Sequence, residues 1–240
     1  PTMAQYGARF KDPFLRRAVP LLVYSNPDIP LIVHLSRHAY GLTGALQWPV
    51  GGSLLFAESM AKRYVDLGGE LRYRSKVVEM LTEGSRATGV RLEDGTAHTA
   101  DIVISNADGR RTILELLGGR FMDERIRRLT SPPPDEMPFA VQVFLGVNRD
   151  LSTEPSSMII LLDRPAELAG RTCGELELQT YGFDPTMAPP GKGVIKVELT
   201  SRYSYWERLA QGGTSRYAEA KQELAERVID LLDQHRFSGL

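Results

Sequence analysis

The chain has 240 residues, enough for one large domain or two small ones with a sizeable buried core. Hydrophobic residues make up 42% of the chain and charged residues 25%, proportions that exclude an intrinsically disordered or collagen-like protein. The net charge is -1, from 29 Lys and Arg against 30 Asp and Glu, so the chain has no overall attraction to phosphate backbones and we expect no nucleic-acid partner.

Apolar residues at helical spacing predict two helices within residues 12–40, joined at a corner that contains Pro27 and Pro30. Residues 53–67 are predicted to form an amphipathic helix that ends at a glycine pair, residues 68–69. The apolar face of this helix includes Leu54, Ala57, Ala61, Tyr64 and Val65.

From residue 70 the apolar period changes to the alternation that is typical of strands. This pattern predicts a strand at Leu71 and Tyr73 and a meander over residues 77–99 that turns at Asp94-Gly95. Residues 101–105 are nearly all apolar, which predicts a central strand buried on both faces, with a helix after it over residues 111–117. This order of elements indicates an α/β sheet.

The C-terminal half begins after a proline linker at residues 132–134. Apolar residues alternate over residues 139–147, 176–178 and 195–199, which predicts antiparallel strands with one face in water. On that face we expect charged residues of neighbouring strands to pair with residues of opposite charge. A long helix is predicted over residues 215–235, packing through Tyr217, Leu224, Val228, Leu231 and Leu232.

Cys173 is the single cysteine, so it has no internal disulfide partner; we expect a reducing compartment such as the cytoplasm and a small buried side chain at this position. No apolar run approaches the roughly 20 residues that a membrane-spanning helix needs. His34 and His38 lie one helical turn apart, but no third ligand follows at a suitable spacing, so we expect no metal site.

Several motifs occur in a fixed order between Trp48 and Leu117: Pro-Val-Gly-Gly at residues 49–52, Gly68-Gly69, Val77, Gly89-Val90, Asp94-Gly95 and Ser105-Asn106-Ala107-Asp108. In order and spacing they resemble phytoene-desaturase-like and retinol-saturase-like flavin oxidoreductases of the amine-oxidase-like FAD superfamily. The segment over residues 184–192, Asp-Pro-Thr-Met-Ala-Pro-Pro-Gly-Lys, is similar to a motif in the substrate domain of that family.

The resemblance implies a fold of the α/β plus α+β class. Residues 48–118 would be the middle segment of a Rossmann-like FAD domain, interleaved with a substrate domain of antiparallel sheet and helices formed by residues 1–47 and 119–240. The chain lacks the Gly-x-Gly-x-x-Gly turn that holds the FAD pyrophosphate, and it also lacks the family's glycine-rich C-terminal segment. We therefore expect an internal portion of a longer enzyme, which has the remainder of that polypeptide as its partner and retains FAD weakly or not at all.

The resemblance also implies cofactor-binding residues. The backbone of Val77 would pair with the adenine, although strand hydrogen bonding without a ligand explains the same residue. Asn106, Ala107 and Asp108 follow a predicted strand where open α/β sheets bind ligands, and capping of the next helix by Asp108 is the alternative. Gly51 and Gly52 would let the backbone approach the flavin or its substrate, and a plain turn is the alternative there.

Tyr40, Trp48 and Phe183 are candidates to line a pocket for an apolar small-molecule substrate, and a simple core role is the alternative. We assign no catalytic acid or base, because the flavin ring carries out hydride transfer. The arginine-rich stretch over residues 110–128 is either a solvated face or a peripheral contact with anionic lipid.

The predicted function is desaturation or saturation of carbon–carbon bonds in an isoprenoid-like substrate by an FAD-dependent oxidoreductase. The alternative is a non-enzymatic module of the same superfamily that binds a hydrophobic ligand or a prenylated protein, as Rab GDP-dissociation inhibitors do.

Overall fold

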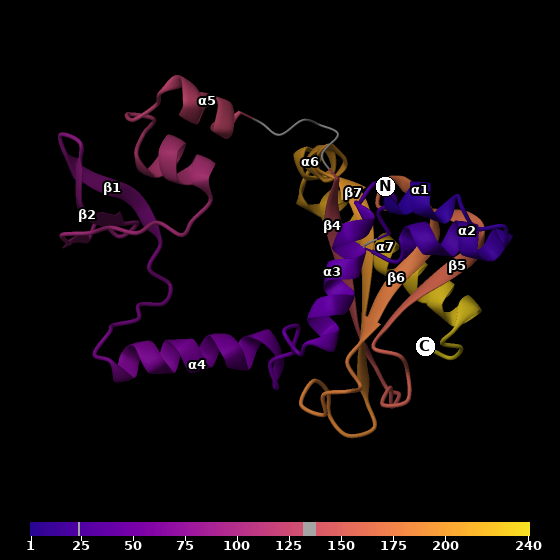
Figure 1. The fold of residues 1–240 in the computed structure, drawn as a ribbon. Coiled ribbons are helices and arrows are strands. Elements are labelled where there is room, and N and C mark those ends of the chain that lie inside the picture. Colours follow the sequence, from indigo (N-terminus) through magenta and orange to yellow (C-terminus); the bar gives the residue numbers. More distant parts are fainter. Residues whose placement is uncertain (24, 132–137) are drawn as a thin grey trace. The chain divides into compact units, whose positions relative to one another are not determined.

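The computed structural model describes residues 1–23, 25–131 and 138–240 (Figure 1). The chain divides into two compact units, of which the first comprises Pro1–Ser59 and Asp135–Leu240 and the second comprises Met60–Pro134. The segments on either side of the second unit therefore pack together. Their assignment to a substrate domain stays a prediction, and the proline linker predicted at residues 132–134 lies outside the described residues.

The first unit is built on a four-stranded antiparallel sheet. Its strands follow the order β4-β7-β6-β5 and span the ranges β4 (Pro138–Val147), β5 (Ser157–Leu168), β6 (Arg171–Thr180) and β7 (Gly193–Arg202). Alternate residues such as Leu178 and Val197 point into the core and are fully buried. The antiparallel strands predicted from the alternation are confirmed, whereas β5 was not predicted.

The expected pairing of opposite charges on the polar face is wrong for neighbouring strands. The register places Glu177 opposite Glu198, a residue of like charge, and Gln179 opposite Lys196. Lys196 instead bonds Glu198 two residues along its own strand, with Nζ and Oε2 3.0 Å apart. The register follows the buried pair Leu178 and Val197, because a slip by one residue would turn every apolar side chain out of the core.

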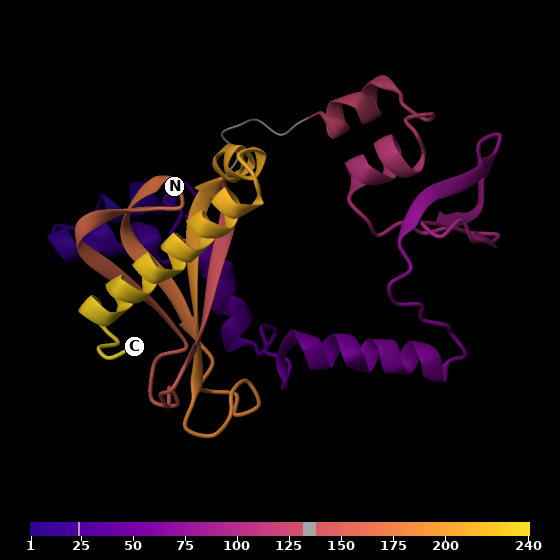
Figure 2. The same cartoon turned by 180° about the vertical axis from the view of Figure 1, so that it is seen from behind.

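Two C-terminal helices, α6 (Tyr203–Gln211) and α7 (Thr214–His235), cover the apolar face of this sheet, and α7 crosses it in Figure 2. The predicted final helix is confirmed, and four of its five predicted packing residues are buried: Leu224, Val228, Leu231 and Leu232. Tyr217 is not part of that core. It lies at the margin, with its ring centroid 5.9 Å from that of Trp206.

The N-terminal helices cover the part of the opposite face formed by β5 and β6 (Figure 1), whereas Gln142 and Phe144 of β4 are exposed on that face, so the predicted wet face is confirmed only at β4. These helices are α1 (Met3–Gly7), α2 (Pro13–Ala18), the 3-10 turn η1 (Val19–Leu21) and α3 (Leu31–Leu42). The prediction of two helices separated by a proline corner is confirmed by α2 and α3. Arg17 of α2 donates hydrogen bonds to the carbonyls of Leu162 at 3.1 Å and Gly174 at 2.9 Å, which attaches the helix to β5 and β6.

Helix α4 (Gly52–Asp66) confirms the helix predicted over residues 53–67. Gly68, with a φ of 90°, ends it as expected, and the Gly69 N–H donates to the Tyr64 carbonyl at 3.0 Å. In the part of the chain that the structure describes, its apolar face is not buried, because Leu54, Tyr64 and Val65 are all exposed.

The second unit contains a three-stranded antiparallel sheet in the order β1-β2-β3, with β1 (Val77–Glu83), β2 (Arg86–Leu92) and β3 (Ala97–Thr99). The π-helical turn η2 (Arg111–Leu116) and helix α5 (Glu124–Thr130) follow the sheet. The predicted meander, its turn at Asp94-Gly95 and the helix after residue 110 are confirmed.

Two predicted strands of this unit are wrong. Leu71 and Tyr73 lie in irregular structure, and residues 101–105 are not a strand. Ile102 is 78% exposed and Ile104 is 87% exposed. A central strand needs a hydrogen-bonded neighbour on each side, and no strand among residues 1–23, 25–131 and 138–240 pairs with residues 101–105. The apolar run is therefore left without the partners that would bury it.

Candidate functional site

An aromatic cluster forms where the connection after α3 meets the loop after β6, within the first unit. Trp48 lies 5.3 Å from Tyr181 and 5.7 Å from Phe183, and Tyr181 lies 6.2 Å from Phe183, measured between ring centroids. Tyr181 is buried, whereas Trp48 is 42% exposed and Phe183 is 52% exposed. The cluster of Trp48, Tyr181 and Phe183 thus has a buried base and two rings that present apolar surface.

Asp184 lies next to this cluster and accepts four hydrogen bonds. Its Oδ2 accepts from Trp48 Nε1 at 3.1 Å and from the Gly51 N–H at 3.0 Å. Its Oδ1 accepts from the Thr186 N–H at 3.0 Å and from the Thr186 hydroxyl at 2.6 Å. The hydrogen bonds from Thr186, then those from Gly51 and Trp48, lower the pKa of Asp184 to about 2. The carboxylate is therefore charged at neutral pH.

The turn over residues 49–52 confirms the turn predicted from Pro-Val-Gly-Gly, and both of its glycines are required by its geometry. Gly51 has a φ of 83° and Gly52 a φ of 71°, in the region that side-chain-bearing residues rarely adopt. The Gly52 N–H donates to the Pro49 carbonyl at 2.8 Å. A Cβ at residue 52 would lie 3.1 Å from Met187 Sδ, so here the backbone approaches the loop after β6 closely.

A recess of about 220 Å³ lies beside this loop, lined in part by Tyr181, Asp184, Met187 and Val194. Sites that enclose a drug-sized ligand usually exceed about 300 Å³. The recess is therefore too small to enclose such a ligand by itself.

The other predicted site residues are not members of the aromatic cluster. Tyr40 is exposed near the end of α3, and its carbonyl accepts hydrogen bonds from the N–H groups of Ala45 and Leu46. Val77 begins β1 in the second unit and pairs with Leu92 of β2. Their roles as ligand-binding residues stay predictions.

Asn106, Ala107 and Asp108 are exposed in the second unit, between the irregular segment 101–105 and η2. Asp108 Oδ1 accepts a hydrogen bond from the Arg111 N–H at 2.9 Å. The capping alternative is thus observed at Asp108. Capping and ligand binding can occur together, so a role of this segment in binding a cofactor stays a prediction.

Sequence reasoning missed three members of the site, which are Tyr181, Asp184 and Met187. Asp184 and Met187 lie inside the segment of residues 184–192 that carried the family resemblance, so their signal was present but was not converted into a role. The signal for Tyr181 was its position two residues before Phe183.

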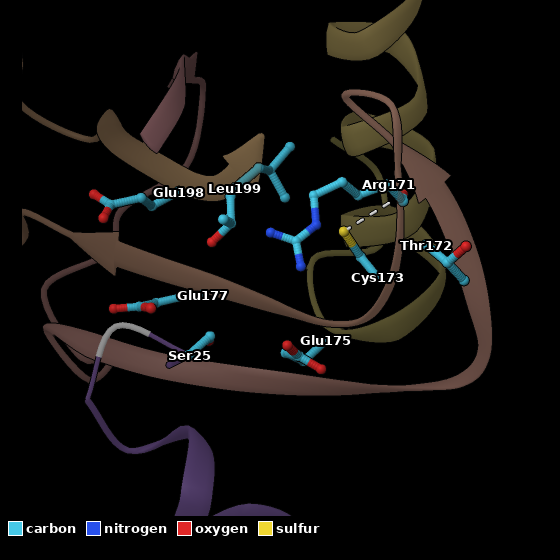
Figure 3. Close-up of a pocket in the computed structure, with 9 residues that line it drawn as sticks. Ser25, Arg171, Thr172, Cys173, Glu175, Glu177, Glu198 and Leu199 are labelled. Atoms are coloured by element: carbon cyan, nitrogen blue, oxygen red, sulfur yellow. Dashed lines mark hydrogen bonds between the residues drawn. The ribbon is translucent and has the colours of Figure 1, made fainter. Parts of the chain in front are cut away.

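A second, polar recess of about 80 Å³ lies on the face of the sheet that carries the N-terminal helices (Figure 3). Arg171, Glu175 and Glu177 line it. Burial raises the pKa values of both glutamates, and the neighbouring Glu198 raises that of Glu177 further. Its volume and its charged lining do not suit an apolar substrate.

Cys173 also lines the polar recess. It packs against the hydrophobic core as expected but is only half-buried, so the expected full burial is wrong. Its Sγ lies 3.8 Å from the Arg171 carbonyl oxygen. Burial raises the pKa of its thiol, which keeps the sulfur protonated and weakly reactive at neutral pH.

His34 and His38 contact each other edge to face, with ring centroids 4.3 Å apart. Among the residues that the structure describes, no group of three His, Cys, Asp or Glu side chains is arranged to hold a metal ion. None of the described helices is both long enough and apolar enough to cross a membrane.

The contribution of Asp184 to the stability of the folded protein is expected to decrease as the pH is lowered. Its pKa is about 2 in the folded protein against 3.8 ordinarily, so the folded state favours the charged form. The resulting stabilisation is fully present above the ordinary value and is lost as the pH falls toward 2. Urea unfolding of the wild type and of Asp184→Asn from pH 7 downward should show a stability difference that is constant near neutrality and shrinks in acid. A difference that does not vary with pH would contradict this assignment.

Most of the chain shares its fold with part of a solved structure. A crystal structure of an oxidoreductase from Methanosarcina mazei superposes with a TM-score of 0.51 and 19% sequence identity, over 78% of this chain and 39% of that one. Residues 8–207 match the family described as flavin containing amine oxidoreductase, and the chain belongs to that family. This confirms the relationship that the ordered motifs predicted.

Two relatives within the family are named as enzymes that act on carotenoids or their precursors. The chain is 28% identical over 202 residues to the chloroplastic prolycopene isomerase of Arabidopsis thaliana, which covers 82% of this chain and 33% of that protein. It is 37% identical over 118 residues to a lycopene-forming phytoene desaturase of Paracoccus sp., over 48% of this chain and 24% of that protein. The chain therefore spans at most about a third of the length of these two relatives.

Membership of a flavin-containing family implies a flavin. The described residues fit the flat face of the ring of such a group, because the aromatic cluster exposes two ring side chains beside a turn of two glycines. They do not fit its phosphate end, since the sequence has no Gly-x-Gly-x-x-Gly turn.

Proposed function

We propose that the chain is a portion of an FAD-dependent oxidoreductase that desaturates or saturates carbon–carbon bonds in an apolar, isoprenoid-like substrate. The observation that carries this proposal is the exposed aromatic cluster beside the glycine turn, in a chain of a flavin-containing family. The names of the relatives, phytoene desaturase and prolycopene isomerase, support an isoprenoid polyene as the substrate class.

Bound FAD would supply hydride transfer, and the chain would supply binding and orientation. Gly51 and Gly52 would lie against the flavin ring or the substrate, and residues 77 and 106–108 would contact the dinucleotide. In this arrangement residues 48–118 belong to the FAD domain, and residues 1–47 and 119–240 belong to the substrate domain.

Polarity separates the aromatic cluster from the other recess of the first unit. The polar recess is lined by Arg171, Glu175 and Glu177, so an apolar chain there would remove water from charged side chains without offering them hydrogen bonds. An apolar chain that binds against the exposed rings of Trp48 and Phe183 carries no such cost. Apolar substrate contact is therefore assigned to the aromatic cluster.

A lipid-soluble substrate would be collected at a membrane surface, and peripheral membrane contact is part of the same proposal. The arginines of η2 and α5 support it, because basic residues near an anionic bilayer are attracted to it. The ion pairs of Arg111 with Glu115 and of Arg128 with Glu124 weaken this attraction. We therefore expect weak, salt-sensitive binding to anionic vesicles.

The first experiment is a FAD titration of this chain beside the longer polypeptide that contains it, followed by anaerobic mixing of the flavin-loaded protein with phytoene and related polyenes. Flavin bound by the longer polypeptide and bleached by a polyene, or reoxidised by one after reduction, is the expected result. Bound flavin that no polyene reduces or reoxidises would contradict the redox assignment. Absence of flavin combined with binding of prenylated peptides would favour the non-enzymatic alternative.

The Phe183→Ala variant tests whether the aromatic cluster contacts the substrate. Removing this exposed ring is expected to raise KM for the polyene about tenfold with little change in kcat, because the contact contributes to binding more than to the chemical step. Steady-state kinetics with Phe144→Ala as control, an exposed phenylalanine on β4 of the same unit, checks the effect. Equal KM values for the two variants would remove Phe183 from the site.

A further inference from the structure

Asp184 connects two segments of the first unit that lie far apart in the sequence. Its Oδ2 accepts hydrogen bonds from Trp48 Nε1 and from the Gly51 N–H, which are 136 and 133 residues away. Its Oδ1 is occupied by the two hydrogen bonds from Thr186. The same carboxylate therefore binds the aromatic cluster, the glycine turn and the loop after β6.

The four donors are neutral, and they bind a side chain that is 6% exposed. Among the described residues no Lys, Arg or His side chain lies within ion-pair distance of Asp184. Hydrogen bonds to an ionised carboxylate are roughly twice as strong as those between neutral groups. The orientation of the Trp48 indole and of the turn thus depends on the charge of one side chain.

Trp48 and Phe183 need this support because they are about half exposed and are not fixed by packing on all sides. Phe183 directly precedes Asp184 in the chain, and the Trp48 ring is held at its Nε1. One carboxylate therefore ties the Trp48 ring to the backbone segment that carries Phe183.

We propose that Asp184 is a positioning residue that holds Trp48 and the turn over residues 49–52 in a single arrangement, so that the aromatic cluster presents one fixed apolar surface to an isoprenoid-like substrate. This role rests on the proposed function for its substrate class. Its structural part, the orientation of Trp48, can be tested independently of any activity.

The test uses Asp184→Asn, which keeps the size of the side chain and removes its charge. In either orientation of the amide, the new NH2 group faces an N–H donor, of Thr186 on one side or of Gly51 and Trp48 on the other. At least one of the present hydrogen bonds must therefore be lost. Asp12→Asn is the matched control, because Asp12 is an exposed aspartate of the same unit whose Oδ1 accepts from the Leu15 N–H at 2.9 Å without contacting Trp48, and asparagine caps a helix about as well as aspartate.

Two readouts are measured on the full-length protein. The first is the indole N–H signal in a ¹H–¹⁵N spectrum, assigned to Trp48 as the signal that Trp48→Phe removes. The second is the affinity for all-trans-retinol, an isoprenoid polyene, from the quenching of tryptophan fluorescence. In Asp184→Asn we expect the Trp48 signal to shift and its hydrogen exchange to accelerate, with retinol binding weakened about tenfold, as for loss of one charge-assisted hydrogen bond. In Asp12→Asn we expect both to match the wild type.

An unshifted Trp48 signal in Asp184→Asn would overturn the proposal, and so would a shifted signal with wild-type affinity for retinol. If the wild type binds neither retinol nor other polyenes, the proposed function fails and the substrate-directed part of this role falls with it. The Trp48 signal in that case still decides whether Asp184 holds the indole, so the two failures can be distinguished.

Discussion

Replacing Phe237 by alanine is expected to lower the free energy of unfolding of the first unit by about 3–5 kcal/mol, the usual cost of truncating a buried aromatic side chain. Phe237 is 0% exposed and belongs to the core between the sheet and α7. Its N–H donates to the Leu232 carbonyl at 2.7 Å, which folds the chain back at the end of α7. The Arg149 guanidinium also lies over its ring, 5.8 Å from the centroid. Truncation removes apolar contacts, leaves a cavity and loses this cation–π contact.

Urea unfolding followed by circular dichroism measures this effect, and Phe144→Ala is the control. Phe144 is the same residue type in the same unit but is 60% exposed, so its truncation is expected to change the stability by about 0.5 kcal/mol or less. Similar losses for the two variants would show that the core does not lie where the structure places it.

Local sequence patterns predicted two kinds of element: a helix with a regular apolar repeat, and strands that pair with the next strand along the chain. Helix α7 was predicted within one residue at its start, because its apolar residues repeat at helical spacing over 22 residues. The β1–β3 meander was predicted because each strand pairs with the next along the chain, through turns marked by glycine.

Residues 101–105 show the limit of such patterns. Their apolar run has the composition of a buried strand, but a strand is defined by its neighbours, and none of the described strands pairs with this run. The register between β6 and β7 was likewise set by buried residues and not by charge, which is why Glu177 lies opposite Glu198.

The candidate site was predictable only in part for the same reason. The family motif around Gly51 and Gly52 and the aromatic residues Trp48 and Phe183 were selected as separate signals. Their meeting point at Asp184 depends on hydrogen bonds between residues more than 130 positions apart, and no spacing rule within one sequence gives that pairing. Asp184 could be found only after the fold had brought the two segments together.

Gly182→Ala is expected to destabilise the first unit by about 1–3 kcal/mol, the usual cost of forcing extra atoms into a packed site, and to disturb the aromatic cluster. A Cβ at residue 182 would lie 2.2 Å from the Leu151 carbonyl oxygen and 2.7 Å from the Ser152 nitrogen. These are backbone atoms, so the clash cannot be relieved by a change of rotamer. Because Gly182 separates Tyr181 from Phe183, the backbone shift must move at least one of these two rings.

Two measurements distinguish this local effect from general destabilisation. Near-ultraviolet circular dichroism reports the packing of the aromatic rings, and urea unfolding reports the stability. Gly146→Ala is the control, because a Cβ at Gly146 of β4 meets no other atom within 4 Å. The control should keep the wild-type spectrum and lose less than about 0.5 kcal/mol, since an added methyl group in open space changes little. A Gly182→Ala protein with an unchanged aromatic spectrum would mean that the Leu151 backbone yields instead, and that the two rings are fixed more firmly than the loop beneath them.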